Sequence, residues 1–146
     1  MFRSASYHTL DNKGRLIIPS RFRKQLKDQE KYGVMISTIK NFLVAYTFSE
    51  WEKVENQIVS IKTTAMNEFR RFFVGNSVEC LCDNHDRILI PKPLRELSNL
   101  KKEIALVGNI DWFEIWSRDL WEANNDKKRL EHSARGTDPD ILSLGL

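Results

Sequence analysis

Apolar residues occur in short runs of strand length, and each run is bounded by a polar turn or by a proline. Residues 16–18 and 88–90 are two such runs, and Pro19 and Pro91 follow them directly. Proline cannot donate to a sheet but fits the first turn of a helix, so each proline predicts a change from strand to helix. The predicted helices span residues 20–26 and 92–98.

Longer apolar and β-branched runs follow each predicted helix and are typical of strands. They span residues 34–39 and 103–107, and each leads through a polar turn into a partner strand. A serine oxygen satisfies free backbone N–H groups at the start of a helix, so Ser49 and Ser117 are predicted to cap the helices that follow. The alternation of short strands with short helices predicts an α+β fold.

This order of elements occurs twice because the chain contains two copies of one unit. A shift of 72 residues aligns YHTLDNKGRLIIPSRFRKQL, which begins at Tyr7, with ECLCDNHDRILIPKPLREL, which begins at Glu79. A shift of 70 residues aligns FLVAYTFSEW with WFEIWSRDLW further along. An internal duplication of this kind predicts two similar units in tandem. Identical pairs at the first shift include Asp11 and Asp83, Asn12 and Asn84, Arg15 and Arg87, Pro19 and Pro91, and Arg23 and Arg95.

We therefore expect two pseudo-symmetric units, each of which mixes short β-hairpins with short helices. Apolar residues recur at helical spacing from Ile58 to Phe73, so a helix is predicted to link the units. Gly136 and Pro139 interrupt the last segment, which predicts a flexible tail. The expected boundaries are 1–57 for the first unit, 58–76 for the linking helix, 77–122 for the second unit, and 123–146 for the end of the C-terminal helix and the flexible tail.

Positive charge is concentrated near the start of the chain. The sequence has 23 Lys and Arg against 20 Asp and Glu, a formal net charge of +3. Residues 1–27 hold seven of these cations and a single acid, Asp11. Such a cluster predicts contact with a polyanion, with Arg3, Arg21 and Arg23 as candidate contacts to a DNA backbone. A merely solvated basic surface is the alternative.

Both copies retain an Asp-x-x-x-Arg turn. In a lone hairpin turn the Asp bonds to its own backbone and the Arg is solvated. Arg at the same place in both copies instead indicates that the Asp orients a guanidinium, whose planar donors can reach a base edge or a phosphate. The candidate DNA-binding residues are therefore Asp11, Asn12, Lys13 and Arg15 in the first copy and Asp83, Asn84, His85 and Arg87 in the second.

Familiar catalytic and metal-binding patterns are missing from the sequence. It contains no G-x-S-x-G, H-E-x-x-H, Walker or G-x-G-x-x-G motif, so an enzyme is not expected and no catalytic residue is assigned. Cys80 and Cys82 are two residues apart and are interpreted as packed thiols rather than as a disulfide or a zinc site. We expect no cofactor and no metal.

Membrane insertion and secretion are not indicated either. No apolar run approaches the roughly 20 residues that a membrane span needs. The segment MFRSASYHTLDNKGR at the start lacks the apolar core of a secretory signal. With 41% hydrophobic residues, the chain is expected to be a folded cytoplasmic protein with no membrane partner.

Four segments occur together in order: MF at the start, YHTLDNKGRLIIPSRFR, DNHDRILIP with LREL, and LVG followed by WFEIWS. Over about residues 1–122 they resemble the MraZ family of bacterial transcriptional regulators. The resemblance implies two tandem units similar to the swapped-hairpin β-barrel (SpoVT-AbrB-type) DNA-binding domains of AbrB-like proteins. It maps the family's Asp-x-x-x-Arg signatures onto residues 11–15 and 83–87. This sequence departs from the family at Ser4 and Asp86, where glycine is usual, and residues 123–146 match no pattern.

The resemblance further implies a ring-shaped homo-oligomer, associated with the nucleoid, that regulates transcription. It would bind short direct repeats of double-stranded DNA in the promoter of the division and cell-wall gene cluster that contains its own gene. Arg15 would be the main base-reading or phosphate-binding group, oriented by Asp11. Asp86 would weaken the contact of the second turn with DNA. The alternatives are a ring-forming scaffold for a protein partner and an antitoxin-like regulator whose toxin-binding tail would be residues 137–146.

Overall fold

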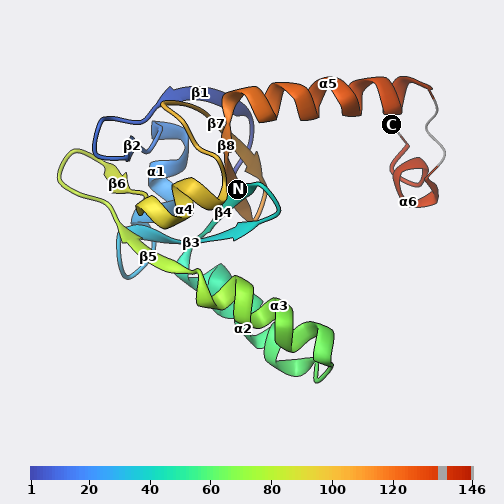
Figure 1. Cartoon of the computed structure of the whole chain (residues 1–146), viewed down its shortest axis with the longest axis horizontal. Helices are drawn as coiled ribbons and strands as arrows, with labels where there is room; N and C mark the ends of the chain where they lie inside the picture. Colours follow the sequence, from blue (N-terminus) through green and yellow to red (C-terminus); the bar gives the residue numbers. More distant parts are fainter. Residues whose placement is uncertain (135–137, 146) are drawn as a thin grey trace.

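The computed structural model describes residues 1–134 and 138–145 and is built on a six-stranded antiparallel sheet (Figure 1). Strands of this sheet are adjacent in the order β1-β7-β8-β4-β3-β5, and β2 and β6 form a separate two-stranded ribbon. The strands are β1 (Ala5–Thr9), β2 (Arg15–Ile17), β3 (Gly33–Ile39), β4 (Phe42–Tyr46), β5 (Val78–Leu81), β6 (Arg87–Leu89), β7 (Glu103–Asn109) and β8 (Trp112–Ser117).

Short helices follow both ribbon strands, as the prolines predict. Pro19 and Pro91 stand at the N-cap positions of α1 and α4, one residue before the first helical turn. The mixture of strands and helices confirms the predicted α+β class. The helices in the described part of the chain are α1 (Ser20–Lys27), α2 (Phe48–Ser60), α3 (Thr64–Gly75), α4 (Lys92–Leu97), α5 (Arg118–Ala134) and α6 (Pro139–Leu142).

Strands from the two halves of the chain pair with each other. β1 pairs with β7, β2 with β6, β3 with β5, and β4 with β8. The hairpins β3–β4 and β7–β8 add the pairings within each half. The two copies therefore exchange strands and form one body, which is consistent with the swapped-hairpin arrangement. The domain boundaries given above remain a prediction.

Side chains of the ribbon alternate between the core and the surface. Leu16 and Ile88 pair directly with each other and are fully buried. Their neighbours Ile17 and Leu89 are 54% and 52% exposed. The buried side belongs to the main hydrophobic core, which also contains a cluster of three phenylalanine rings: Phe2, Phe22 and Phe113.

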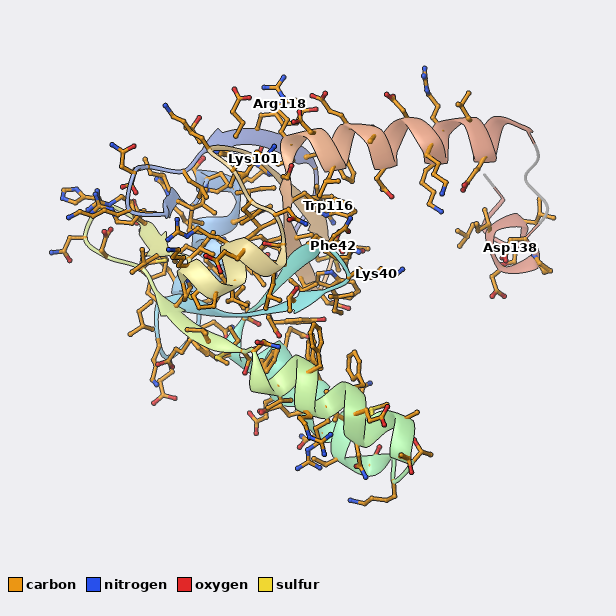
Figure 2. The ribbon with its side chains drawn as sticks, in the orientation of Figure 1. Lys40, Phe42, Lys101, Trp116, Arg118 and Asp138 are labelled. Carbon is orange, nitrogen blue, oxygen red and sulfur yellow. The ribbon has the colours of Figure 1, made fainter. Side chains whose placement is uncertain are left out.

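Aromatic residues of the large sheet pack against one another. Phe42 on β4 and Trp116 on β8 stack with their ring centres 4.3 Å apart (Figure 2). Glu114 accepts a hydrogen bond at 3.0 Å from each of the indole N–H groups of Trp112 and Trp116. The rings and the indole N–H groups therefore already have partners within the fold.

Two helices, rather than one, connect the halves of the chain. The sequence predicts one linking helix over residues 58–76, whereas α2 ends at Ser60 and α3 begins at Thr64. The Thr63 hydroxyl accepts a hydrogen bond from the N–H of Met66 and caps the second helix. Figure 1 shows α2 and α3 side by side as an arm that extends away from the sheet.

The predicted cap at Ser49 is wrong. The Thr47 hydroxyl accepts the hydrogen bond from the N–H of Glu50 at 3.2 Å, and Ser49 lies inside the first turn of α2. Thr47 precedes the helix and has extended backbone, which is the conformation that a capping residue needs.

α5 begins at Arg118, directly after Ser117, and leads away from the sheet (Figure 1). In the predicted tail, residues 135–137 and 146 lie outside the described residues, and Asp138 caps the short helix α6. No helix within the described ranges is long and apolar enough to cross a membrane.

The alternation along β2 predicts unequal effects of truncation on stability. Leu16→Ala leaves a cavity in the core, and we expect it to lower the free energy of unfolding by about 2–5 kcal/mol. Ile17→Ala, one position along the same strand, is expected to cost less than about 1 kcal/mol because its side chain is largely exposed. Urea denaturation measures both values, and equal losses would contradict the register of β2.

Candidate nucleic-acid interface

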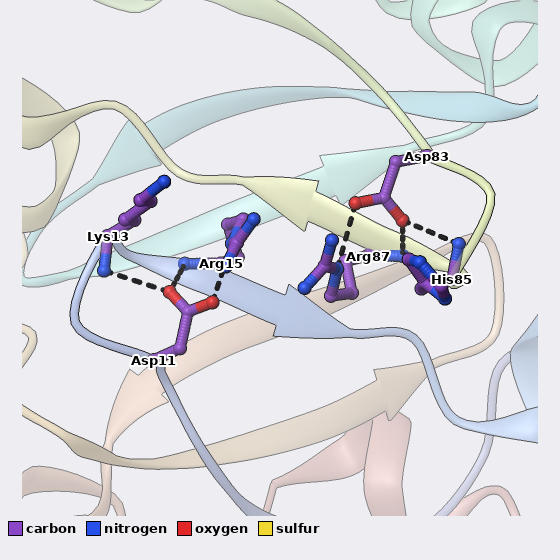
Figure 3. Close-up of polar contacts among 6 residues, drawn as sticks. All are labelled: Asp11, Lys13, Arg15, Asp83, His85 and Arg87. Atoms are coloured by element: carbon purple, nitrogen blue, oxygen red, sulfur yellow. Dashed lines mark hydrogen bonds and ion pairs between the residues drawn. The ribbon is translucent and has the colours of Figure 1, made fainter.

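The first turn is organised around the carboxylate of Asp11 (Figure 3). One of its oxygens accepts hydrogen bonds from the backbone N–H groups of Lys13 and Arg15, both at 2.9 Å. The other accepts from Nε of Arg15. The carboxylate thus closes the turn and orients the guanidinium at the same time, while Asn12 is exposed within the turn.

The second turn has the same geometry. Asp83 accepts from the backbone N–H groups of His85 at 2.8 Å and Arg87 at 3.0 Å, and from Nε of Arg87 at 2.8 Å (Figure 3). Asn84 is again exposed within the turn. The duplicated motif therefore forms two copies of one local structure.

The two arginines share the outward face of the ribbon. In the antiparallel pairing of β2 with β6, Arg15 lies opposite Leu89 and Ile17 lies opposite Arg87. All four are on the side opposite to the buried Leu16–Ile88 pair, because side chains alternate along a strand. The ribbon therefore presents two oriented guanidinium groups and two exposed aliphatic side chains on one surface.

Both carboxylates stay ionised well below neutral pH. Hydrogen bonds from the backbone N–H and the side chain of Arg15 lower the pKa of Asp11 to about 2. Desolvation raises the pKa of Asp83, but the hydrogen bonds from Arg87 and His85 outweigh it, so that this pKa also lies below its usual value. Each guanidinium is therefore held by an anion at physiological pH.

The fourth position of each turn has a left-handed backbone. Gly14 has φ +85° in the first turn, and Asp86 has φ +61° at the equivalent position of the second. Glycine adopts this conformation readily, whereas Asp86 is held there by contacts of its side chain. The Tyr32 hydroxyl donates to its carboxylate at 2.6 Å, and Arg23 lies 3.5 Å from it. The departure from the family's usual glycine thus replaces glycine by an anion without changing the turn.

The three candidate backbone contacts lie in different surroundings. Nε of Arg21 donates to the carbonyl of Arg3 at 3.1 Å, and its guanidinium lies over the ring of Phe22. Arg3 is exposed near the start of the chain. Arg23 contacts the second turn, because it forms an ion pair with Asp86. It also donates to the carbonyl of Ile18 at 2.7 Å. Contact of these three arginines with DNA remains a prediction.

Arg95 belongs beside the first turn, although the sequence reasoning did not assign it to the site. Its guanidinium carbon lies 2.7 Å from where a side-chain carbon on Gly14 would be. Nε of Arg95 donates to the carbonyl of Ile90 at 3.0 Å, as Arg23 does to Ile18 in the other copy. The match of Arg95 with Arg23 at the 72-residue shift was the available signal.

The two cysteines are free and packed. Cys80 is buried and Cys82 is partly buried. Burial raises the pKa of the Cys80 thiol to about 12 and that of Cys82 to about 11, so both are neutral thiols at physiological pH. Within the described ranges no group of three or more His, Cys, Asp or Glu side chains is placed to hold a metal ion.

Comparison with known proteins assigns these features to a family. The family model for MraZ protein matches residues 1–72 and again residues 73–140, once for each half of the chain. The chain belongs to the MraZ family.

Three relatives of this chain have a common name. A transcriptional regulator MraZ of Desulforapulum autotrophicum is 48% identical over 146 residues, and one of Desulfosudis oleivorans is 42% identical over 148 residues, with full coverage of both chains in each case. One of Caldanaerobacter subterraneus is 39% identical over 117 residues, which cover 79% of this chain and 80% of the relative. These MraZ matches confirm the resemblance and come from proteins named as regulators rather than as enzymes.

The hydrogen bonds to Asp11 predict its titration. In the folded chain the carboxyl should titrate at about pH 2 rather than near the ordinary 3.8. Because the folded-state pKa is the lower one, this turn stabilises the fold above the unfolded pKa, and the stabilisation is lost as the pH falls through about 2. In Arg15→Gln the backbone N–H bonds remain, so the pKa should rise but stay below 3.8. Carbon-13 NMR of the carboxyl groups measures both values, and titration at 3.8 in the unsubstituted chain would contradict the turn geometry.

Proposed function

We propose that this MraZ chain is a transcriptional regulator that binds specific sequences in double-stranded DNA. The outward face of the β2–β6 ribbon supports this most directly, because Arg15 and Arg87 are each oriented there by a carboxylate. The relatives named as transcriptional regulators support the coarser part of the proposal. The protein would act in the cytoplasm, in association with the nucleoid.

The ribbon is suited to the major groove. A two-stranded β-ribbon fits this groove in B-DNA, where arginine donates to O6 and N7 of guanine. Each Asp accepts from Nε of its arginine, which leaves the terminal amino groups of Arg15 and Arg87 to donate to a base. Leu89 lies opposite Arg15 and Ile17 lies opposite Arg87, and both offer apolar contact to thymine methyl groups.

The first turn is the stronger anchor in this proposal. It adds Lys13 to the Asp11–Arg15 pair, whereas the second turn has His85 at that position and the additional acid Asp86. Asp86 lowers the positive charge that a DNA phosphate would meet there. Contact of the second turn with DNA is therefore expected to contribute less to affinity.

We further propose that the protein forms a homo-oligomeric ring. The α2–α3 arm exposes Phe69 and Phe72, which are 40% and 43% exposed, and it borders an apolar hollow lined in part by Ile58 and Met66. When such a surface on one copy packs on a different surface of the next, the contact is heterologous and closes only as a ring. The exposed aromatic side chains support this assembly.

The DNA target proposed for the ring is a set of short direct repeats. Linked binding sites act at high effective concentration, so weak contacts by successive copies give strong overall binding. Following the family resemblance, we place the repeats in the promoter of the division and cell-wall gene cluster that contains the protein's own gene.

A ring-forming scaffold for a protein partner is the second candidate, because the exposed aromatic residues of α3 suit protein contact as well. An antitoxin-like regulator would in addition need residues 137–146 to bind a toxin. Of these, residues 138–145 are described, and Ile141 and Leu142 are exposed in α6. In the scaffold the basic face is incidental, so DNA binding separates it from the regulator.

Arg15→Ala tests the proposed base contact. A bidentate contact between arginine and guanine contributes about 1–3 kcal/mol, and the loss multiplies over the copies that bind together. We expect at least about a 10-fold loss of affinity for promoter DNA, with little change for scrambled DNA. Arg87→Ala should lose less. Fluorescence anisotropy with labelled duplexes measures the affinities, and thermal unfolding checks that the variants fold.

Unchanged promoter affinity of Arg15→Ala would refute its role. A salt series on the unsubstituted chain decides between the regulator and the scaffold. The slope of log K against log salt should be about −0.9 for each phosphate neutralised, whereas a flat profile supports the scaffold.

The spacing of the repeats tests the ring. Successive boxes should lie about one helical turn apart, near 10–10.5 base pairs, so that each presents the same groove to the ring. Moving the boxes apart by half a turn is expected to weaken binding of the assembly. Native mass spectrometry of the free protein gives the oligomeric state. A stable monomer, or indifference to the half-turn shift, would contradict the ring.

A further inference from the structure

The two Asp-x-x-x-Arg turns are held in matching frames, each supplied by the other half of the chain. The N–H of Ile90 donates to the carbonyl of Gly14 at 3.0 Å, and the N–H of Ile18 donates to the carbonyl of Asp86 at 2.8 Å. Each turn is therefore joined to the strand end of the opposite copy. The surroundings of the two turns therefore correspond residue by residue.

The residues beside the two turns also correspond. The N–H of Leu10 donates to the carbonyl of Lys102 at 2.8 Å, and the N–H of Cys82 donates to the carbonyl of Tyr32 at 2.9 Å. Leu10 and Cys82 directly precede the Asp of their turns. Lys102 beside the first turn therefore takes the place of Tyr32 beside the second.

In the second turn, Asp86 neutralises the neighbouring Arg23. Asp86 accepts the hydrogen bond of the Tyr32 hydroxyl through one carboxylate oxygen, and Arg23 lies 3.5 Å from the other. Lys27 lies over the ring of Tyr32, with Nζ 5.4 Å from its centre. The arginine that corresponds to Arg95 is thus already paired with an acid.

The cation beside the first turn has no counterpart of Asp86. Gly14 stands where Asp86 stands in the other turn, so Arg95 lies against bare backbone. A surface hollow of about 230 Å³ opens beside the turn, and Arg95, Lys101 and Lys102 contribute to its lining. Lys101 lies in the segment between α4 and β7 (Figure 2).

The hollow contains more positive than negative charge. Asp11 also lines it, but this carboxylate is already bonded to Arg15. In the part of the chain that the structure describes, none of the three cations forms an ion pair within 4 Å. Glu103 and Asp119 line a neighbouring hollow with the two lysines, and Glu96 lines another with Arg95 and Lys101. Three cations around one surface hollow favour an anion from solution.

We propose that the hollow formed by Arg95, Lys101 and Lys102 binds a backbone phosphate of the DNA strand whose bases Arg15 contacts. This inference rests on the proposed function and adds a second kind of contact to it. Contacts to phosphate position a protein on the duplex, whereas contacts to bases select the sequence. The hollow and Arg15 therefore divide these two tasks at one turn, whereas beside the second turn the counterpart of Arg95, Arg23, is paired with Asp86.

The double variant Lys101→Gln with Lys102→Gln tests the hollow. Its affinity for promoter DNA and for scrambled DNA should fall by the same factor, since both duplexes carry phosphates. The loss of each phosphate contact costs about 8-fold at 0.1 M salt and makes the salt slope less steep by about 0.9 for each bound subunit. Fluorescence anisotropy over a salt series measures both quantities.

Lys31→Gln is the matched control. Lys31 occupies the position of Lys101 in the first copy, at the 70-residue shift, and pairs with Glu79 at 3.0 Å. Lys31→Gln removes one positive charge, as Lys101→Gln alone does, whereas the double variant removes two. Lys31→Gln should leave the salt slope unchanged. An unchanged slope in the double variant, or an equal change in Lys31→Gln, would overturn the proposal. Thermal unfolding checks the fold, and Lys101→Gln alone repeats the test if the double variant is unstable.

The failure of the hollow and the failure of the proposed function have different signatures. If the unsubstituted chain does not prefer promoter over scrambled DNA, sequence-specific regulation is wrong, but the slopes on scrambled DNA still decide the hollow. If the chain prefers promoter DNA and the double variant keeps its slope, the hollow alone is wrong.

Asp86→Asn tests whether the acid in the second turn is what keeps Arg23 from binding phosphate. Asparagine tolerates the left-handed backbone and its amide oxygen can accept the Tyr32 hydrogen bond, but it no longer neutralises Arg23. We expect tighter binding to both duplexes and a salt slope that is steeper by up to about 0.9 for each bound subunit. An unchanged salt slope would show that Asp86 does not prevent the second turn from binding a phosphate.

Discussion

Antiparallel pairing of β2 with β6 determines where the groups proposed to contact DNA lie. Leu16 and Ile88 face each other in the core, and burial of both directs the neighbouring side chains outward. A slip of β2 by one residue would turn Arg15 toward the core and Leu16 toward solvent, at a large cost in free energy. The contact that joins the two halves of the chain is thus also the contact that orients Arg15 and Arg87.

Features that depend on neighbouring residues could be predicted from the sequence. The Asp11–Arg15 turn spans five residues, and its hydrogen bonds follow from side chains within that span. The changes from strand to helix at Pro19 and Pro91 are local for the same reason. The family resemblance added the swapped-hairpin architecture, which the periodicity of apolar residues alone does not specify.

Features that depend on distant residues could not be derived in this way. Arg95 reaches the first turn from the second half of the chain, and nothing near Gly14 in the sequence indicates this approach. The break between α2 and α3 is not visible in the sequence pattern, because the apolar spacing continues across it. In the structure the helix is interrupted, and Thr63 caps the start of α3. The approach of Arg95 depends on tertiary packing, whereas the Thr63 cap is a local contact that the continuous apolar spacing conceals.

The covalent link between the two copies has a consequence for the symmetry of recognition. A ribbon made from two identical chains would have an exact two-fold axis, and such a reader suits a palindrome. Here Gly14 at one end of the ribbon and Asp86 at the other make the ends unlike. The ribbon accordingly has a polarity, and under the proposed function a DNA box that fits it would have a direction. Copies arranged head to tail around a ring would read boxes that all point the same way.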